Sequence, residues 1–431
     1  MLFTYTPKLS FWWDEFSLIQ AHRKPFWGII DSHMGHFMPV GRLAFAFYVS
    51  AFGDSYLVMI LANALICATS LYMIFYIVKG EDQTSFLGFI LLICPVISLL
   101  FSTGYIYDIQ WAMQICWFLS VFFGATALIA LQLNSYRFIF FALSITLSWL
   151  SLSSNIIGVA IFVTAIAIWK SDLKIRDGIF VIAICGCLFF TGFILARYFH
   201  PIDPNAYGTP VEFGVILDNW IEIVQLTGAI ATTWLLSPLS INSTLSGEGF
   251  GALGGHVYRY SNLNMLFLTI VLILIITWCV HSHNRKNPTT LLILLLGIIL
   301  YSGLIVATRY VGHLSDLLHV RYAPILQLLA TLFWTIAVSI FLAHRRRMLL
   351  AVLVIPISLL VFATIGYVSV NARKLIEESS FIGRVTYTLS QLNEFKFCNT
   401  PNQVIIFKEI QPSLSSQEMC TIVASVPGLI D

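Results

Sequence analysis

Long apolar runs separated by short polar segments dominate the chain. An α-helix needs about 20 apolar residues to cross the hydrocarbon core of a bilayer. About ten runs approach that length, which predicts an all-α polytopic membrane protein. The fourth and fifth runs are divided only by Ser153, Ser154 and Asn155. The runs lie at 54–78, 86–103, 110–131, 138–153, 155–169, 178–197, 263–280, 289–308, 323–343 and 348–367.

Composition supports lipid as the solvent for much of the chain. Of the 431 residues, 58% are hydrophobic and only 10% are charged, whereas about 25% of the residues in soluble domains are charged. The formal net charge of +2 comes without a basic stripe. Nucleic acid is therefore excluded as an expected partner.

Lysine and arginine in the connections set the expected orientation, because cytoplasmic loops are enriched in these residues. With the N-terminus outside, the outward connections between spans hold few cations over many residues, namely Arg197, Arg259, Arg309 and Arg321. The inward connections hold Lys79, Arg137, Lys170, Lys174, Arg176, Arg285, Lys286, Arg345, Arg346 and Arg347. We therefore expect the first loop, the 198–262 loop and the C-terminal tail to face outward.

This topology divides the chain into five parts. They are an outward first loop with interfacial helices (1–53), transmembrane helices 1–6 (54–197), an outward loop (198–262), transmembrane helices 7–10 (263–367) and an extracytoplasmic tail (368–431). Because the chain opens in an outward loop with no preceding span, we hypothesise that an N-terminal transmembrane helix is missing.

Two outward regions have structure of their own. Within 211–237, Asp218 and Glu222 share a face among aliphatic and tryptophan residues, which favours an amphipathic helix in the membrane interface over a poor transmembrane span. The tail contains a strand-like segment, NQVIIFKEI, and is expected to be a small α/β unit. If it is extracytoplasmic, a disulfide between Cys398 and Cys420 is plausible.

Polar residues gather in three outward stretches. The first loop carries the acidic pair Asp14 and Glu15 in FWWDEF, followed by His33, His36 and Arg42 in SHMGHFMPVGRL. The link after the second run carries Asp108 in GYIYDIQW. The stretch before the ninth run carries Arg309, Tyr310, His313, Asp316, His319, Arg321 and Tyr322. Since ionisable groups this close to lipid usually face a cavity or a reaction, we expect one outward-opening polar pocket.

The residue types in that pocket suit phosphosugar chemistry. A carboxylate can take a proton from a hydroxyl nucleophile or, with its neighbours, hold a divalent metal. Arginine grips phosphate through paired hydrogen bonds. Plainer alternatives remain: Asp14, Glu15 and Asp108 also suit the first turn of a helix, and Arg321 suits an interfacial anchor. His33 and His36 fit acceptor contact or structure better than metal ligation.

The motifs WWDEF, HMGHFMPVGRLAF and the late RY pair resemble those of the GT-C superfamily of integral-membrane glycosyltransferases. The resemblance covers the topology of most of the chain but rests on few residues. It implies that Asp14, perhaps with Glu15, is the base toward the acceptor and that Asp108 is a second carboxylate. It implies donor-phosphate binding by Arg321 and Arg309. Independently of the resemblance, we expect substrate contacts from His33, His36, Arg42, Tyr310, His313 and Tyr322.

The expected function is transfer of a sugar from a polyprenyl-phosphate donor to an envelope glycan, lipid or protein acceptor. The active site would face outward from the plasma membrane or a bacterial inner membrane, with no cofactor required except, in one reading, a divalent metal on Asp14, Glu15 and Asp108. Two alternatives stay open: a transporter or flippase of lipid-linked saccharides, which needs ionisable residues near mid-membrane, and a polymerase or ligase that uses a large outward loop.

Overall fold

The computed structural model describes residues 36–52, 56–79, 86–100, 112–132, 137–170, 174–199, 213–236, 261–282, 285–309 and 323–343, with Ser102, Tyr105, Asp108 and Ile109 between the third and fourth ranges. Helices make up nearly all of this part of the chain, which contains no β-strand. The α-helices are α4 (Pro39–Phe52), α5 (Tyr56–Lys79), α6 (Phe86–Leu100), α8 (Ile115–Ala130), α9 (Arg137–Ser151), α10 (Ile156–Lys170), α11 (Ile175–Phe199), α12 (Phe213–Asp218), α13 (Trp220–Leu236), α15 (Ser261–His281), α16 (Lys286–Arg309) and α18 (Ala323–Ala343). Short 3₁₀ turns, η2 (Ala112–Gln114) and η3 (Ser153–Asn155), precede α8 and α10.

Nine of the predicted apolar runs coincide with these helices, and η3 forms the turn expected at 153–155. Among the described residues, five helical stretches are long and apolar enough to cross a membrane: Val58–Lys79, Ala112–Ala130, Ser153–Lys170, Ile175–Ala196 and Lys286–Ala307. The shorter apolar helices are Pro39–Phe52, Gly88–Leu100, Arg137–Ser151, Met265–His281 and Pro324–Ile340. A membrane-embedded helical fold is thereby supported.

The described residues do not include the tenth run, 348–367, or the 368–431 tail. The predicted α/β fold of the tail and the predicted disulfide between Cys398 and Cys420 therefore lie outside them.

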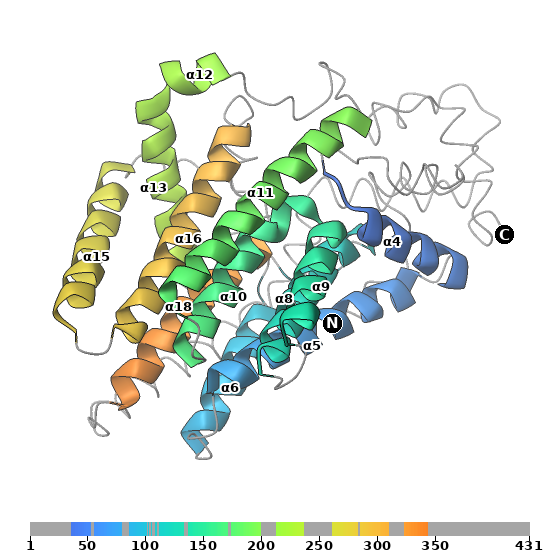
Figure 1. The fold of residues 1–431 in the computed structure, drawn as a ribbon, viewed down its shortest axis with the longest axis horizontal. Coiled ribbons are helices and arrows are strands. Elements are labelled where there is room, and N and C mark those ends of the chain that lie inside the picture. Colours follow the sequence, from blue (N-terminus) through green and yellow to red (C-terminus); the bar gives the residue numbers. More distant parts are fainter. Residues whose placement is uncertain are drawn as a thin grey trace, which may run out of the picture.

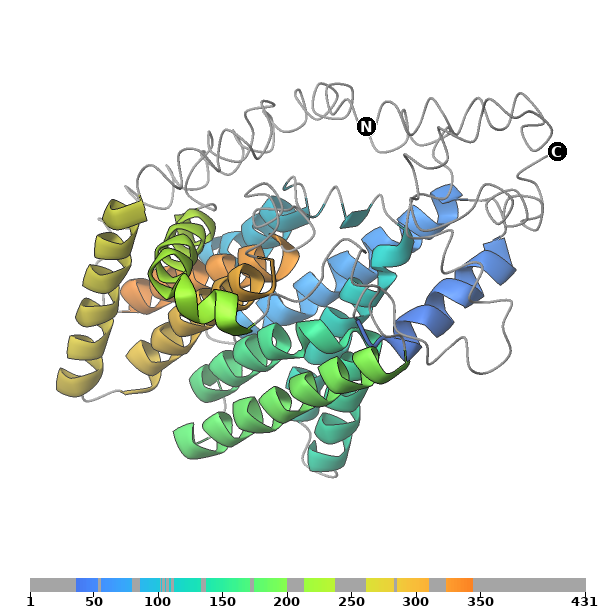
Figure 2. The ribbon, with the colours of Figure 1, turned by 90° about the horizontal axis from the view of Figure 1, so that it is seen from above.

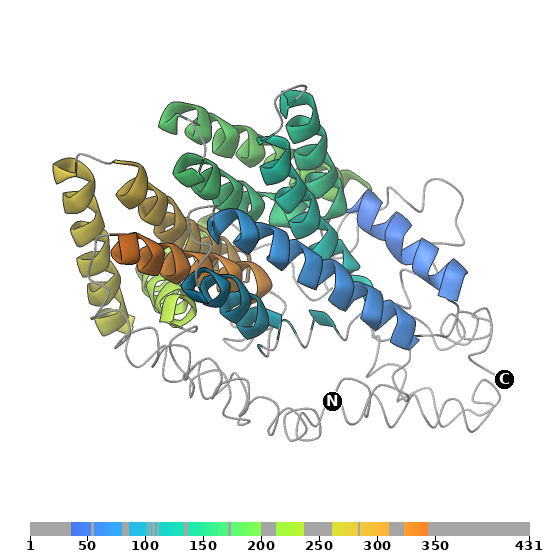
Figure 3. The ribbon, with the colours of Figure 1, turned by 90° about the horizontal axis from the view of Figure 1, so that it is seen from below.

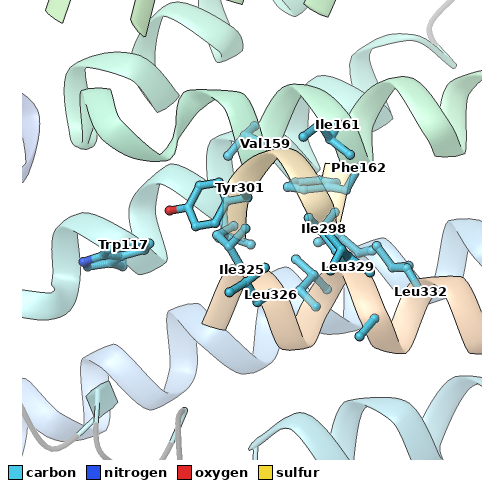
Figure 4. Packing of buried hydrophobic residues seen from close by; sticks show 14 of the residues in the cluster. Trp117, Val159, Ile161, Phe162, Ile298, Tyr301, Ile325, Leu326, Leu329 and Leu332 are labelled. Atoms are coloured by element: carbon cyan, nitrogen blue, oxygen red, sulfur yellow. The ribbon is translucent and has the colours of Figure 1, made fainter. Parts of the chain in front are cut away.

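Helix α10 forms the centre of the bundle. Every residue from Ile156 to Ile168 is buried, and α10 contacts α5, α8, α9, α11, α16 and α18. Figure 4 shows Ile161 and Phe162 of α10 close to Ile298 of α16 and Leu329 of α18. A helix that is apolar on every side can be buried on every side, because it has no polar face that needs solvent.

Glycine lets two neighbours approach α10 closely. A Cβ at Gly124 of α8 would lie 2.6 Å from Phe162 and 2.7 Å from Val159, both on α10. A Cβ at Gly158 of α10 would lie 2.5 Å from the Ile325 side chain of α18. Small residues at helix interfaces are the usual way in which membrane helices pack, because lipid removes most of the hydrophobic drive between them.

Helices at the periphery expose large apolar side chains. On α11, Phe180 and Ile194 are each 64% exposed, and on α15 Val280 is 67% exposed. In all three views, α15 lies at one edge of the bundle and α4 at the opposite edge (Figures 1, 2 and 3). Such surfaces are unfavourable in water and suit contact with acyl chains.

The segment predicted to be an interfacial helix contains α12 and α13. Helix α13 packs on α15, α16 and α18, and Ala229, Ile230 and Leu235 on it are buried. The indole Nε1 of Trp334 on α18 donates a hydrogen bond of 2.8 Å to the Leu235 carbonyl oxygen. The helical state is confirmed, whereas its depth relative to the membrane stays a prediction.

Candidate functional site

The predicted site residues divide between the described and the undescribed parts of the chain. His36, Arg42 and Asp108 are described, and Arg309 closes α16 without a described side chain. The predicted residues that lie outside the described ranges are Asp14, Glu15, His33, Tyr310, His313, Asp316, His319, Arg321 and Tyr322. The geometry below therefore concerns the described residues at the end of the bundle that is predicted to face outward, here called the outer end.

Asp108 lies in the link between α6 and α8, and its side chain is 0% exposed. The side-chain amide of Asn63 on α5 donates a hydrogen bond of 3.5 Å to the carbonyl oxygen of the next residue, Ile109. The Asp108 carboxyl is close enough for its charge to act on Cys67 of α5 and on Cys116 of α8. The link thus carries its carboxyl inward, between the outer halves of two helices.

The same link is bonded to the start of α18. The Ser102 hydroxyl donates to Oε1 of Gln327 over 2.7 Å, and the Tyr105 hydroxyl donates to the Pro324 carbonyl oxygen over 2.8 Å. Burial raises the pKa of Tyr105 well above its ordinary value, and the nearby Cys67 and Asp108 raise it further. Tyr105 therefore stays a neutral hydrogen-bond donor at physiological pH.

Helix α4 brings a buried cation to this end. Gly41 fits tightly against α8 and α9, since a Cβ there would lie 2.6 Å from both the Cys116 Cβ and the Ser151 carbonyl oxygen. The next residue, Arg42, is only 7% exposed. In the described part of the chain, Arg42 and Asp108 are the buried charged side chains. Gly41, the residue before Arg42, packs against Cys116, and the charge of Asp108 acts on the same cysteine.

The end of the first loop is fixed to the turn between α9 and α10. The Phe37 amide donates to the Ser153 hydroxyl oxygen over 3.3 Å, and the Ser153 amide donates back to the Phe37 carbonyl over 3.0 Å. From α16, the Tyr301 hydroxyl donates to Oδ1 of Asn155 over 3.5 Å. These bonds join the segment that follows His33 and His36 to the same end of the bundle as Asp108.

The buried charged and amide side chains near this end of the bundle are here called the outer polar layer. Its members come from α4, α5, the link before α8, the turn before α10 and α18, and each is at most 7% exposed. Sequence reasoning identified only two of them. The members that it missed are amide residues, each of which stands alone near the outer end of an apolar run. The layer consists of Arg42, Asn63, Asp108, Gln114, Asn155 and Gln327.

A small cavity lies directly beneath the link. Its volume of about 10 Å³ is close to the minimum that holds one water molecule. The cavity is lined by Cys67, Ser70, Leu71, Tyr105, Trp117, Phe118, Val121 and Pro324.

The predicted metal site is not tested by this geometry. Among the described residues, no three His, Cys, Asp or Glu side chains are grouped as metal ligands. Two of the three predicted ligands, Asp14 and Glu15, lie outside those residues, so the metal stays a prediction.

Comparison with known proteins leaves the residues themselves as the basis for any functional argument. The chain matches no protein-family model, no curated protein sequence and no solved structure.

Proposed function

We propose that this chain is an integral-membrane glycosyltransferase of the GT-C type. It moves a sugar from a polyprenyl-phosphate donor to a cell-envelope glycan, lipid or protein at the outer face of the membrane. The observation that carries the proposal is the complete burial of Asp108 within the outer polar layer. Burying an ionisable group near lipid is costly, and such groups are functional by default.

The chemistry assigned to the site follows from the residue types. Asp14, assisted by Glu15, takes the proton from the acceptor hydroxyl. The hydroxyl oxygen then bonds to the anomeric carbon, while the bond from that carbon to the phosphate oxygen breaks through an oxocarbenium-like transition state. The phosphate leaves with the bonding electron pair, and Arg321 and Arg309 balance its growing negative charge. Attack opposite the leaving group inverts the anomeric centre.

In this proposal, Asp108 affects the reaction through its charge and does not contact the substrate. Its side chain is buried, so it supplies negative charge beneath the pocket, with buried Arg42 on the neighbouring helix α4. Fixed charges in a low-dielectric region act over longer distances than the same charges in water. The link that carries Asp108 is bonded through Tyr105 to Pro324, three residues after Arg321 in the chain. This connection supports placing the carboxylate stretch and the predicted phosphate-binding stretch around one pocket.

A transporter of lipid-linked saccharides is the main alternative. Transporters of this kind carry ionisable residues near mid-membrane, often on broken helices. In the described residues, the two buried charged side chains lie instead in α4 and in a link between helices. This distribution favours chemistry at the outer surface over passage through the bundle.

The test is made in cells, with Asp14→Asn and Asp108→Asn expressed at the wild-type level. Both variants should accumulate the polyprenyl-phosphate sugar and lose the corresponding surface glycan. Asp177→Asn is the matched control, because Asp177 is partly exposed at the start of α11 and far along the chain from the site. Normal glycan transfer by Asp14→Asn would remove the proposed base. Saccharide movement that survives loss of Asp14, Glu15 and Asp108 would favour transport.

A further inference from the structure

The inner end of the bundle carries a group of cations on three adjacent helices. The Thr290 hydroxyl on α16 lies 2.9 Å from the Lys286 carbonyl and 3.4 Å from the Ala165 carbonyl of α10. The last turn of α10 is therefore beside the first turn of α16. Lys170 ends α10, and Lys286 begins α16, so the two lysines extend from neighbouring helix ends.

Helix α11 begins at the same end. A Cβ at Gly178 would lie 2.7 Å from Thr164 and 2.9 Å from Ile168, both on α10, so the first turn of α11 packs on the last turns of α10. Lys174 and Arg176 are exposed there. The nearest acid that has a described contact is Asp177, whose Oδ1 lies 3.6 Å from Nε of Arg176. The exposed cations Lys170, Lys174, Arg176, Arg285 and Lys286 form the inner basic rim.

Aromatic and aliphatic neighbours place this rim at headgroup depth. The Lys170 ammonium lies 4.3 Å from the centre of the Trp169 ring, and tryptophan is enriched at the boundary between headgroups and acyl chains. Immediately along α11, Ile179 and Phe180 are 60% and 64% exposed. Cations therefore stand directly above an apolar surface that no other described helix covers.

We propose that the inner basic rim binds the phosphate groups of anionic phospholipids, with an acyl chain lying along the exposed side chains of α11. Charge complementarity selects this occupant, because the five cations outnumber the one described acid beside them, Asp177, and a zwitterionic headgroup carries no net charge to balance the excess. Basic residues at a membrane surface attract anionic lipid strongly enough that each contributes about fivefold in binding. The ammonium and guanidinium groups donate hydrogen bonds to the phosphate oxygens.

The experiment uses the full chain in nanodiscs of phosphatidylcholine alone or with added phosphatidylglycerol. The wild type should unfold at a higher temperature when phosphatidylglycerol is present. This difference should shrink between about 50 mM and about 500 mM NaCl, because salt screens exposed charges. The triple variant Lys170→Gln, Lys174→Gln, Arg176→Gln should lose most of the difference at low salt.

Arg137→Gln is the matched control. Arg137 is also an exposed cation, stacked 4.9 Å from the Phe138 ring, but it begins α9, which packs mainly on α8. This variant should lose much less of the response to phosphatidylglycerol than the triple variant, because it removes one cation that lies away from the rim. Equal unfolding temperatures of the wild type in both lipids at low salt would overturn the proposal, as would an equal loss in Arg137→Gln. If the triple variant does not fold, the salt series on the wild type decides.

Discussion

The Tyr105 hydroxyl donates a hydrogen bond of 2.8 Å to the Pro324 carbonyl oxygen and joins residues 219 positions apart in the chain. Tyr105 is 2% exposed and lies three positions before Asp108 in the chain. Pro324 lies three positions after Arg321. This hydrogen bond joins the link that carries Asp108 to the start of α18, two segments whose proximity is not evident from the sequence.

Removing this hydrogen bond should destabilise the fold without disturbing packing. Tyr105→Phe keeps the ring but leaves the Pro324 carbonyl without this donor, so the free energy of unfolding should fall by about 1 to 2 kcal/mol. Thermal unfolding in detergent measures the change. Tyr76→Phe is the control, because Tyr76 is 57% exposed and should have little effect. Equal stability of the two variants would show that the bond contributes nothing.

Tyr105 should also make stability depend on alkaline pH. Its pKa is raised in the folded state, first by burial and then by Cys67 and Asp108, whereas the unfolded value is about 10. A group with a raised folded pKa contributes stability that is present below the unfolded pKa and lost as the pH rises toward the folded one. The stability difference between wild type and Tyr105→Phe should therefore be constant to about pH 9 and shrink above about pH 10. Unfolding temperatures measured between these limits test this, and a difference independent of pH would refute it.

Helix α4 should depend on the absence of a side chain at Gly41. In Gly41→Ala, the new methyl group meets a backbone oxygen, that of Ser151, at 2.6 Å. A backbone atom cannot rotate away, so α4 must shift, at a cost of about 1 to 3 kcal/mol. The measurement is thermal unfolding together with cysteine labelling of Cys116, which becomes faster if α4 moves off α8.

Gly186→Ala is the matched control for this substitution. Gly186 lies within α11, and a Cβ there meets nothing within 4 Å. Alanine should be neutral or stabilise the helix by about 0.5 to 1 kcal/mol. If both alanine variants behave alike, the close approach of α4 to α8 and α9 is wrong.

The bond between Ser102 and Gln327 should appear as a coupling energy. A double-mutant cycle with Ser102→Ala and Gln327→Ala should give about 0.5 to 1.5 kcal/mol between the two positions. Unfolding of the wild type, both single variants and the double variant measures it. Strict additivity would mean that the 2.7 Å contact does not stabilise the link against α18.

The central position of α10 predicts a strong contrast between two phenylalanines. Phe162 is 0% exposed and Phe190 on α11 is 64% exposed. Phe162→Ala should cost about 3 to 5 kcal/mol through cavity formation. Phe190→Ala should cost much less, because it removes the ring contact with Phe189 and contacts with lipid or detergent. If the two substitutions lowered the unfolding temperature by similar amounts, the assignment of α10 to the core and of α11 to the periphery of the bundle would be wrong.

Much of the helical framework could be predicted, because helix length and apolar content are local properties of the chain. Even the weakly marked turn at Ser153, Ser154 and Asn155 is present as η3. The candidate site was predicted less completely. Asp108 and Arg42 were identified because charges are rare in this chain, but Asn63, Gln114, Asn155 and Gln327 carry no charge and resemble occasional polar residues of any span.

By itself, the sequence predicted which segments form helices, indicated a lipid environment for many of them, and showed which ends carry the cations. Only the tertiary structure decided that α10 is enclosed by other helices while α11 lies at the periphery of the bundle. Both helices are apolar on nearly every side, and since acyl chains are as apolar as leucine, no pattern distinguishes contact with protein from contact with lipid. Burial of Asp108 likewise depends on α5, α8 and α18 meeting around one link. Whether these helices meet there depends on contacts between segments that are distant in the chain, which the local sequence pattern does not reveal.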